Sequence, residues 1–165
     1  MRKLIVIITI ALLSLPLSAW CQGDRLSMAE LFKSMPDSLL PYLTTNNRLD
    51  MLDFRAAKMK AAVTNKLECE SEMTALTSDS LSVRMSESLR VDMFTLPAEE
   101  VYDSCQYVIC MLKTYLMQGE PAECVAAFFT SKWRPLGDLP QYSSKYVYSS
   151  ILRKDEELPD KKTFR

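Results

Sequence analysis

The sequence predicts an α+β fold, in which two N-terminal helices pack on one face of a mostly antiparallel sheet of about five strands in a meander. Apolar residues recur every three or four positions up to Val63, as in helices, and at every second position from Leu67 onward, as in strands. The polar breaks between the alternating runs are short enough for hairpins. Neighbouring strands are therefore expected to pair with each other.

The first 21 residues are expected to be removed as a secretory signal peptide. Arg2 and Lys3 precede the apolar run LIVIITIALLSLPL, and SAWC ends the segment. Ala19 and Cys21 stand at the two small-residue positions, so we expect cleavage after Cys21. A lipid-modified Cys21 is less expected, because Trp20 stands where a lipoprotein signal needs a small residue. We expect an exported protein of the periplasm or cell envelope, without a transmembrane helix in its mature form.

The remaining chain has a nearly balanced charge. The full chain has 20 basic and 21 acidic side chains, and the loss of Arg2 and Lys3 leaves 18 basic side chains and a net charge of −3. This composition gives no basic patch, so nucleic acid is not an expected partner. Residues 22–152 are expected to form a single α+β domain, and the charged residues 153–165 a disordered tail.

The first helix is expected to begin at Ser27. Ser27 and Glu30 match a capping box, in which the side chain of each residue binds the backbone amide of the other. Pro36 and Pro41 follow and prevent one long helix from forming.

The second helix is expected to begin at Asn47 and to run to Val63. Asn47 is a good capping residue, because its side-chain oxygen accepts a hydrogen bond from the first turn. Arg48 and the other charged residues are expected to remain in solvent. The buried stripe is expected to consist of Leu49, Leu52, Ala56, Met59 and Val63.

The strands are expected from Leu67 onward. Pro97 is expected to end the third of them, before an acidic loop over residues 98–104. Residues 107–117, YVICMLKTYLM, are almost wholly apolar, which indicates a central strand covered on both faces. Residues 125–133 give the fifth strand. After Pro135 the pattern fits a helix and a strand equally well.

Four cysteines remain after cleavage, namely Cys69, Cys105, Cys110 and Cys124. An exported protein meets an oxidising compartment, so this even number permits two disulfides in any of three connectivities. Buried free thiols are the other interpretation, because Cys69 and Cys110 lie among alternating or apolar residues.

Several classes of chemistry are excluded by composition. The chain contains no histidine, which excludes Ser-His and Cys-His catalysis and most zinc and copper sites. Its three glycines, Gly23, Gly119 and Gly137, cannot form a glycine-rich phosphate loop. We therefore expect no catalytic residue, no metal and no cofactor.

Two groups of residues are candidates for function. Aromatic rings lose little entropy on binding, so Phe129, Trp133, Tyr142 and Tyr146 are predicted to bind a glycan or a peptide. The alternative is that these rings pack in the core. Two carboxylate pairs, Asp50 with Asp53 and Glu99 with Glu100, are candidates for the acid and base of a hydrolase.

The chain also resembles a known family. The runs MPDSLLPYLTTNNRLDMLDF, VTNKLECESEMTALTSDSLSVRMSES, VICMLKTY and FFTSKWRPL are similar, in this order, to DUF3256, a family of small exported proteins largely restricted to Bacteroidales. The similarity covers about residues 28–136. It implies a Gram-negative host and a periplasmic or outer-surface location, and it brings no activity. Cys21 and the segment after Arg153 do not match the family.

The sequence favours a binding or interaction module without catalytic machinery, whose partner is an envelope protein, a glycan or a peptide. A carboxylate-based hydrolase of glycans or peptides is the first alternative. An accessory subunit of an envelope complex is the second, and an exposed apolar patch or an unpaired strand edge would favour it.

Overall fold

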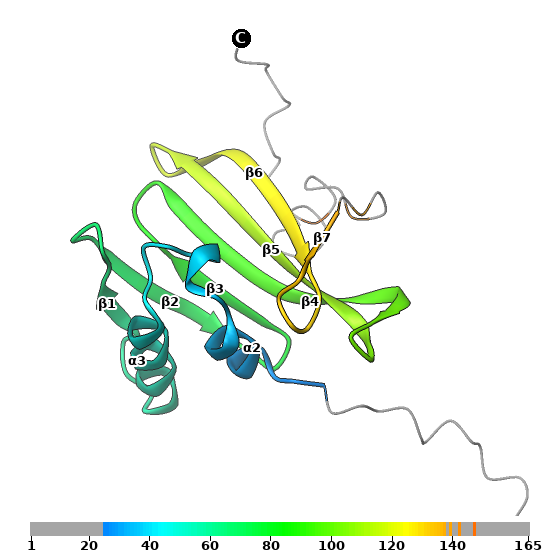
Figure 1. Cartoon of the computed structure of the whole chain (residues 1–165). Coiled ribbons are helices and arrows are strands. Elements are labelled where there is room, and N and C mark those ends of the chain that lie inside the picture. The colour runs from blue at the N-terminus through cyan, green and yellow to red at the C-terminus, as the bar shows by residue number, and fades with distance from the viewer. Residues whose placement is uncertain (1–24, 138, 140–141, 143–146, 148–165) are drawn as a thin grey trace, which may run out of the picture.

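The computed structural model describes residues 25–137 together with Leu139, Tyr142 and Val147 (Figure 1). Several predictions concern other residues. The signal peptide with its cleavage site at Cys21, the aromatic candidate Tyr146 and the charged tail 153–165 all lie outside the described residues.

A curled antiparallel sheet of seven strands forms most of the described chain (Figure 1). Each strand pairs with its neighbour in the sequence, in the order β1 to β7. The strands are β1 (Ala62–Thr64), β2 (Glu70–Leu76), β3 (Ser80–Arg84), β4 (Leu89–Tyr102), β5 (Cys105–Met117), β6 (Glu120–Phe129) and β7 (Pro135–Leu136).

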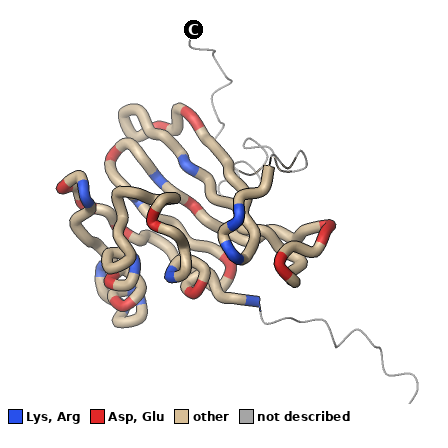
Figure 2. Tube along the Cα trace, in the orientation of Figure 1, with Lys and Arg blue, Asp and Glu red and all other residues tan. Residues whose placement is uncertain are grey.

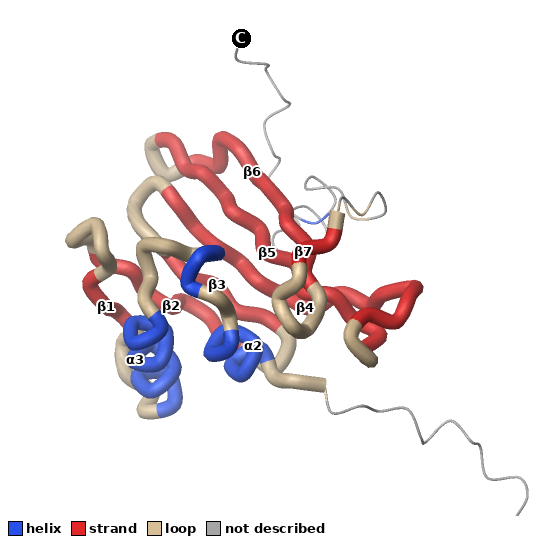
Figure 3. The backbone as a smooth tube through the Cα atoms, in the orientation of Figure 1, coloured by secondary structure: helices blue, strands red, loops and turns tan. Residues whose placement is uncertain are grey.

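The helices lie on one face of this sheet (Figure 3). They are α2 (Met28–Ser34), the short 3-10 helix η2 (Asp37–Leu39) and α3 (Thr45–Ala56). α3 contacts β1 and β2, and α2 contacts β3 and β4. No helix of the described part is long and apolar enough to span a membrane.

The predicted number of about five strands is wrong, because the sheet has seven strands, each paired with its neighbour in the sequence. β1 has three residues and β7 has two, and runs of this length are too short to show an alternating pattern. β4 is also longer than predicted, since it continues beyond Pro97 to Tyr102. The register with β5 shifts between these two residues, and such an irregularity tolerates a proline that has no amide hydrogen.

The predicted limits and buried stripe of α3 are also wrong. Thr44, rather than Asn47, is the capping residue, and its side chain accepts a hydrogen bond from the Asn47 amide. The helix ends at Ala56, so Met59 and Val63 are not part of it. Its fully buried residues are Arg48 and Met51. Of the predicted stripe, Leu49 and Leu52 are half-buried and Ala56 is exposed.

The predicted start of the first helix is confirmed. The Ser27 amide donates to Glu30 Oε2 at 2.8 Å, and the Glu30 amide donates to Ser27 Oγ at 3.3 Å. The Met28 amide donates to the carbonyl of Ser78 at 2.8 Å, which fixes this end of α2 to the turn between β2 and β3.

The predicted double burial of the central strand is confirmed as well. All residues of β5 from Tyr107 to Leu112 are buried. Alternate residues enter two hydrophobic clusters. The inner cluster lies on the helix side and includes Met28, Phe32, Met51, Met93, Ile109 and Met111. The outer cluster lies on the opposite face and consists of Phe94, Leu96, Val108, Cys110, Leu112, Phe128 and Val147.

Candidate functional site

A cavity of about 630 Å³ lies between the two helices and the end of β2. We call it the groove. Side chains of α2, α3, the following loop and β2 all contribute to its walls. The lining residues are Ala29, Leu52, Asp53, Arg55, Ala56, Lys58, Met59 and Leu76.

The C-terminal end of α3 forms one rim of the groove. Lys58 has a positive φ of 57°, and its amide donates to the carbonyl of Arg55 at 3.0 Å. The Met59 amide donates to the carbonyl of Phe54 at 2.8 Å. These two bonds make a Schellman motif, a common way for an α-helix to end at a residue in the left-handed conformation. The motif holds the backbone of Met59 in place although its side chain is 58% exposed.

Charged residues border the apolar part of the groove. Asp53 lies on α3, while Arg55 and Lys58 lie at its C-terminal end. Figure 2 shows charges of both signs along this helix. The groove thus carries two cations and one anion, whereas the whole chain has a formal charge of −1.

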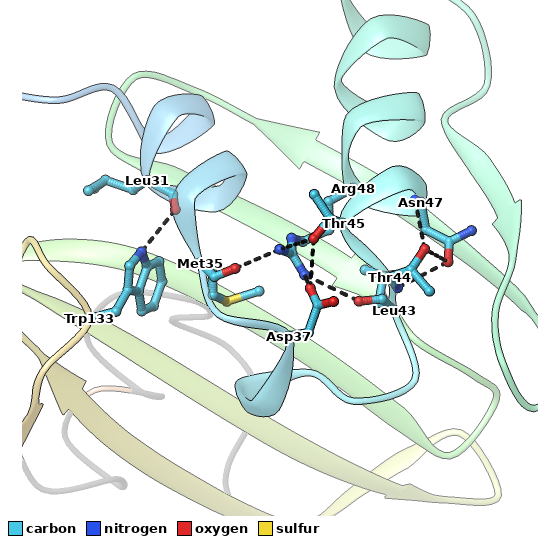
Figure 4. Close-up of polar contacts among 9 residues, drawn as sticks. All are labelled: Leu31, Met35, Asp37, Leu43, Thr44, Thr45, Asn47, Arg48 and Trp133. Carbon is cyan, nitrogen blue, oxygen red and sulfur yellow. Dashed lines mark hydrogen bonds and ion pairs between the residues drawn. The ribbon is translucent and has the colours of Figure 1, made fainter.

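Arg48 connects the two helices that form the groove walls (Figure 4). Its guanidinium donates to the carbonyl of Met35 at 2.6 Å, to Asp37 Oδ1 at 2.7 Å and to the carbonyl of Leu43 at 3.2 Å. It also lies over the ring of Phe32, 6.0 Å from the ring centroid. Hydrogen bonds from Arg48 lower the pKa of Asp37. Arg48 is 1% exposed, so it positions α2 and α3 and does not meet a ligand itself.

The three predicted aromatic residues that the structure describes, Phe129, Trp133 and Tyr142, do not gather at one site. Phe129 and Trp133 lie together under α2, with ring centroids 5.6 Å apart, and both are 6% exposed. Trp133 Nε1–H donates to the carbonyl of Leu31 at 3.0 Å (Figure 4). Tyr142 packs against the outer cluster at Phe128, and its hydroxyl donates to the carbonyl of Pro97 at 2.8 Å.

The predicted carboxylate pairs lie in two separate regions. Asp50 and Asp53 are both exposed on α3, and Asp53 borders the groove. Glu99 and Glu100 are also exposed, and they line a smaller cavity of about 210 Å³ together with Tyr102 and Tyr142. Desolvation and the charge of Glu100 raise the pKa of Tyr102. A hydrolase based on these pairs stays a prediction from the sequence.

Cys69, Cys105, Cys110 and Cys124 are free thiols in the structure. Cys69 is exposed, Cys105 and Cys124 are half-buried, and Cys110 is buried in the outer cluster. Burial raises the pKa of the Cys110 thiol to about 12, and it also raises the pKa of Cys124. Within residues 25–137 and the three further positions described, no three acidic or cysteine side chains are placed to hold a metal ion.

Most residues of the groove were not predicted as functional. Met59 was expected in the core, and Arg48 was expected in solvent. Lys58 and Leu76 had no assigned role. The sequence does carry one signal for the correct start of α3. Thr44 and Asn47 have the spacing of a capping box, which places the helix start three residues before the predicted start at Asn47.

Comparisons with known proteins give a family but no activity. A search of the curated proteins found no match. Among solved structures, a domain of an uncharacterised protein from Porphyromonas gingivalis W83 is similar, with 25% sequence identity and a TM-score of 0.52. The match covers 75% of this chain and 67% of that chain. The model of the family described as a protein of unknown function (DUF3256) matches residues 24–161. Because this match spans most of the sequence, the chain belongs to the DUF3256 family.

Proposed function

We propose that this protein is an exported interaction module that binds a protein partner of the cell envelope in the groove and catalyses no reaction. The observation that carries the proposal is the groove itself, an open cavity with apolar walls and a methionine exposed on its rim. Methionine is flexible and polarisable, and it is common on surfaces that bind protein segments.

A protein partner fits the groove better than a glycan does. The predicted glycan site depends on flat aromatic faces that are open to solvent. Phe129 and Trp133 are buried under α2, and the residues that line the groove include no aromatic side chain. The apolar contribution comes instead from Ala29, Leu52, Ala56, Met59 and Leu76.

The experiment is crosslinking in cells of a C-terminally tagged copy, followed by mass spectrometry of the captured material. We expect one protein partner at a fixed ratio, and its capture is expected to fail with Met59→Asp. Met117→Asp is the matched control, because Met117 is 65% exposed at the turn between β5 and β6 and does not line the groove.

Two results would contradict the proposal. Equal capture by both variants would show that the partner does not bind in the groove. Loss of capture with both variants would indicate a nonspecific effect of the added charge. The same mass spectra report the N-terminus of the mature chain. A chain that begins at Gln22 would support export, and a retained Met1 would contradict it.

A further inference from the structure

Within the part of the chain that the structure describes, one edge of β2 has no neighbouring strand beside the groove. β1 pairs with β2 only at Glu70–Glu72, and the last contact on this side is a hydrogen bond of 2.8 Å from the Met73 amide to the carbonyl of Ala61. Leu76 pairs with Leu81 of β3, and no described residue pairs with Leu76 on the side of β1. Figure 3 shows how short β1 is beside β2.

The direction of the Leu76 backbone groups follows from the neighbouring hydrogen bonds. The Thr77 amide donates to the carbonyl of Ser80 at 2.8 Å, so it points toward β3. Successive amides of a strand point to opposite edges. The amide hydrogen and the carbonyl of Leu76 therefore point away from β3, toward the open edge. Because the side chain of Leu76 also lines the groove, the edge and the groove form one continuous surface.

The charges beside this edge favour an acidic segment. Arg55 and Lys58 border the groove against the single carboxylate of Asp53. This excess of positive charge is local, since the chain as a whole is slightly acidic. Opposite charges across an interface fix the register and speed association.

We propose that an extended segment of the partner protein adds to the open edge of β2 as a further strand. The backbone of this segment forms hydrogen bonds with the backbone of Leu76, and its alternate apolar side chains enter the groove. An acidic side chain of the segment forms ion pairs with Arg55 and Lys58. An unpaired strand edge beside an apolar groove is the geometry that strand addition requires. This inference rests on the proposed function, because it names the conformation of the partner at the same groove.

The test selects dodecapeptides from a random displayed library on the purified mature chain. We expect the selected peptides to carry β-branched residues at alternate positions, together with Asp or Glu. Nuclear magnetic resonance then compares hydrogen exchange of the Leu76 amide with and without a selected peptide. We expect this exchange to slow at least tenfold when the peptide is bound.

Two variants separate the backbone from the side chain of Leu76. Leu76→Ala shortens the side chain and keeps the amide, whereas Leu76→Pro removes the amide hydrogen at an edge position where proline is tolerated. We expect Leu76→Pro to bind the peptide about tenfold more weakly than Leu76→Ala does, because one backbone hydrogen bond is lost. The exchange measurement uses the unchanged chain, so it decides the matter even if Leu76→Pro does not fold.

The results also separate this inference from the proposed function. Peptides that bind without protecting Leu76, but lose binding with Met59→Asp, would overturn strand addition and leave the groove as a binding site. Selection of no peptide that depends on Met59 would overturn strand addition as well. Analytical ultracentrifugation tests whether the chain forms a dimer. A dimer that Leu76→Pro dissociates would identify a second copy of the chain as the occupant and would contradict a different partner.

Discussion

At the residue scale, Arg48 is the main polar connection within the helical layer. Its guanidinium binds two backbone carbonyls that no helix or strand ladder satisfies, those of Met35 and Leu43. Asp37 supplies the opposite charge from a half-exposed position. A charged side chain is stable at 1% exposure only because these acceptors surround it.

We expect Arg48→Ala to lower the free energy of unfolding by about 3 kcal/mol, because buried carbonyls lose their donor and a large side chain leaves a void. Urea unfolding measures this change. Arg55→Ala on the same helix is the control and is expected to change stability by about 0.5 kcal/mol or less. Equal effects of the two substitutions would show that Arg48 has no special role.

Stability is expected to fall in acid through the same contact. Hydrogen bonds from Arg48 and then Thr45 lower the pKa of Asp37 from its ordinary value of 3.8. A carboxyl group whose pKa is lower in the folded state stabilises the fold above the unfolded-state pKa, and this stabilisation is lost as the pH falls through the folded-state pKa. The stability difference between the parent chain and Asp37→Asn is therefore expected to shrink from about pH 5 to about pH 2. Urea unfolding over this range measures it, and a constant difference would contradict the assignment.

The cysteines are expected to differ in reactivity. Cys69 is exposed, whereas Cys110 is fully buried and its pKa is raised to about 12. Iodoacetamide at neutral pH should alkylate Cys69 in the folded chain and Cys110 only after denaturation, since the thiolate is the reactive form. Peptide mass spectrometry locates the label. Equal labelling of both cysteines in the folded chain would show that the outer cluster opens readily.

At the element scale, the end of α3 determines the shape of the groove. The helix stops because Lys58 adopts a left-handed conformation, and this turns Met59 to the rim. Glycine is the usual residue at such a position, because a side chain there is strained. Because no glycine marks this position, the sequence pattern predicts a helix that continues to Val63.

We expect Lys58→Gly to raise the free energy of unfolding by about 1 kcal/mol, because glycine removes the strain of the positive φ. Lys58→Ala removes the same charge and keeps the strain, so it should leave stability nearly unchanged. Thermal and urea unfolding of the two variants provide the comparison. A loss of stability with Lys58→Gly would mean that the lysine side chain itself supports the helix end.

At the scale of the whole molecule, β5 is shared by two cores. Met111 enters the inner cluster and Leu112 enters the outer cluster, and they are 1% and 0% exposed. Both faces of this strand are therefore expected to contribute to one cooperative unit, with α2 and α3 covering the inner face (Figure 1).

Met111→Ala and Leu112→Ala should each lower the free energy of unfolding by about 3 kcal/mol, as large-to-small substitutions in cores do. Val125→Ala on the neighbouring strand is the control, since Val125 is 43% exposed. Urea unfolding followed by both fluorescence and circular dichroism tests cooperativity. A small effect of Leu112→Ala alone would show that the outer cluster adds little to stability.

Local chemistry allowed several features to be predicted from the sequence. The capping box of Ser27 and Glu30 is formed by residues three apart, so no distant contact was needed to find it. The burial of β5 could also be predicted from neighbouring residues, because a continuous apolar run fits a strand only where both faces are covered. The family followed from runs of residues spread over most of the chain.

Tertiary structure alone decided the candidate site. Met59 and Leu76 are 17 positions apart and meet because the end of α3 lies over the end of β2. The two shortest strands, β1 and β7, exist because longer neighbours supply their hydrogen bonds. Arg48 can be buried because Met35, Asp37 and Leu43 bring hydrogen-bond acceptors to its guanidinium. Periodicity reports which side of an element is apolar, whereas contacts between distant segments determine where an element ends, which charges become buried and which strand edge stays open.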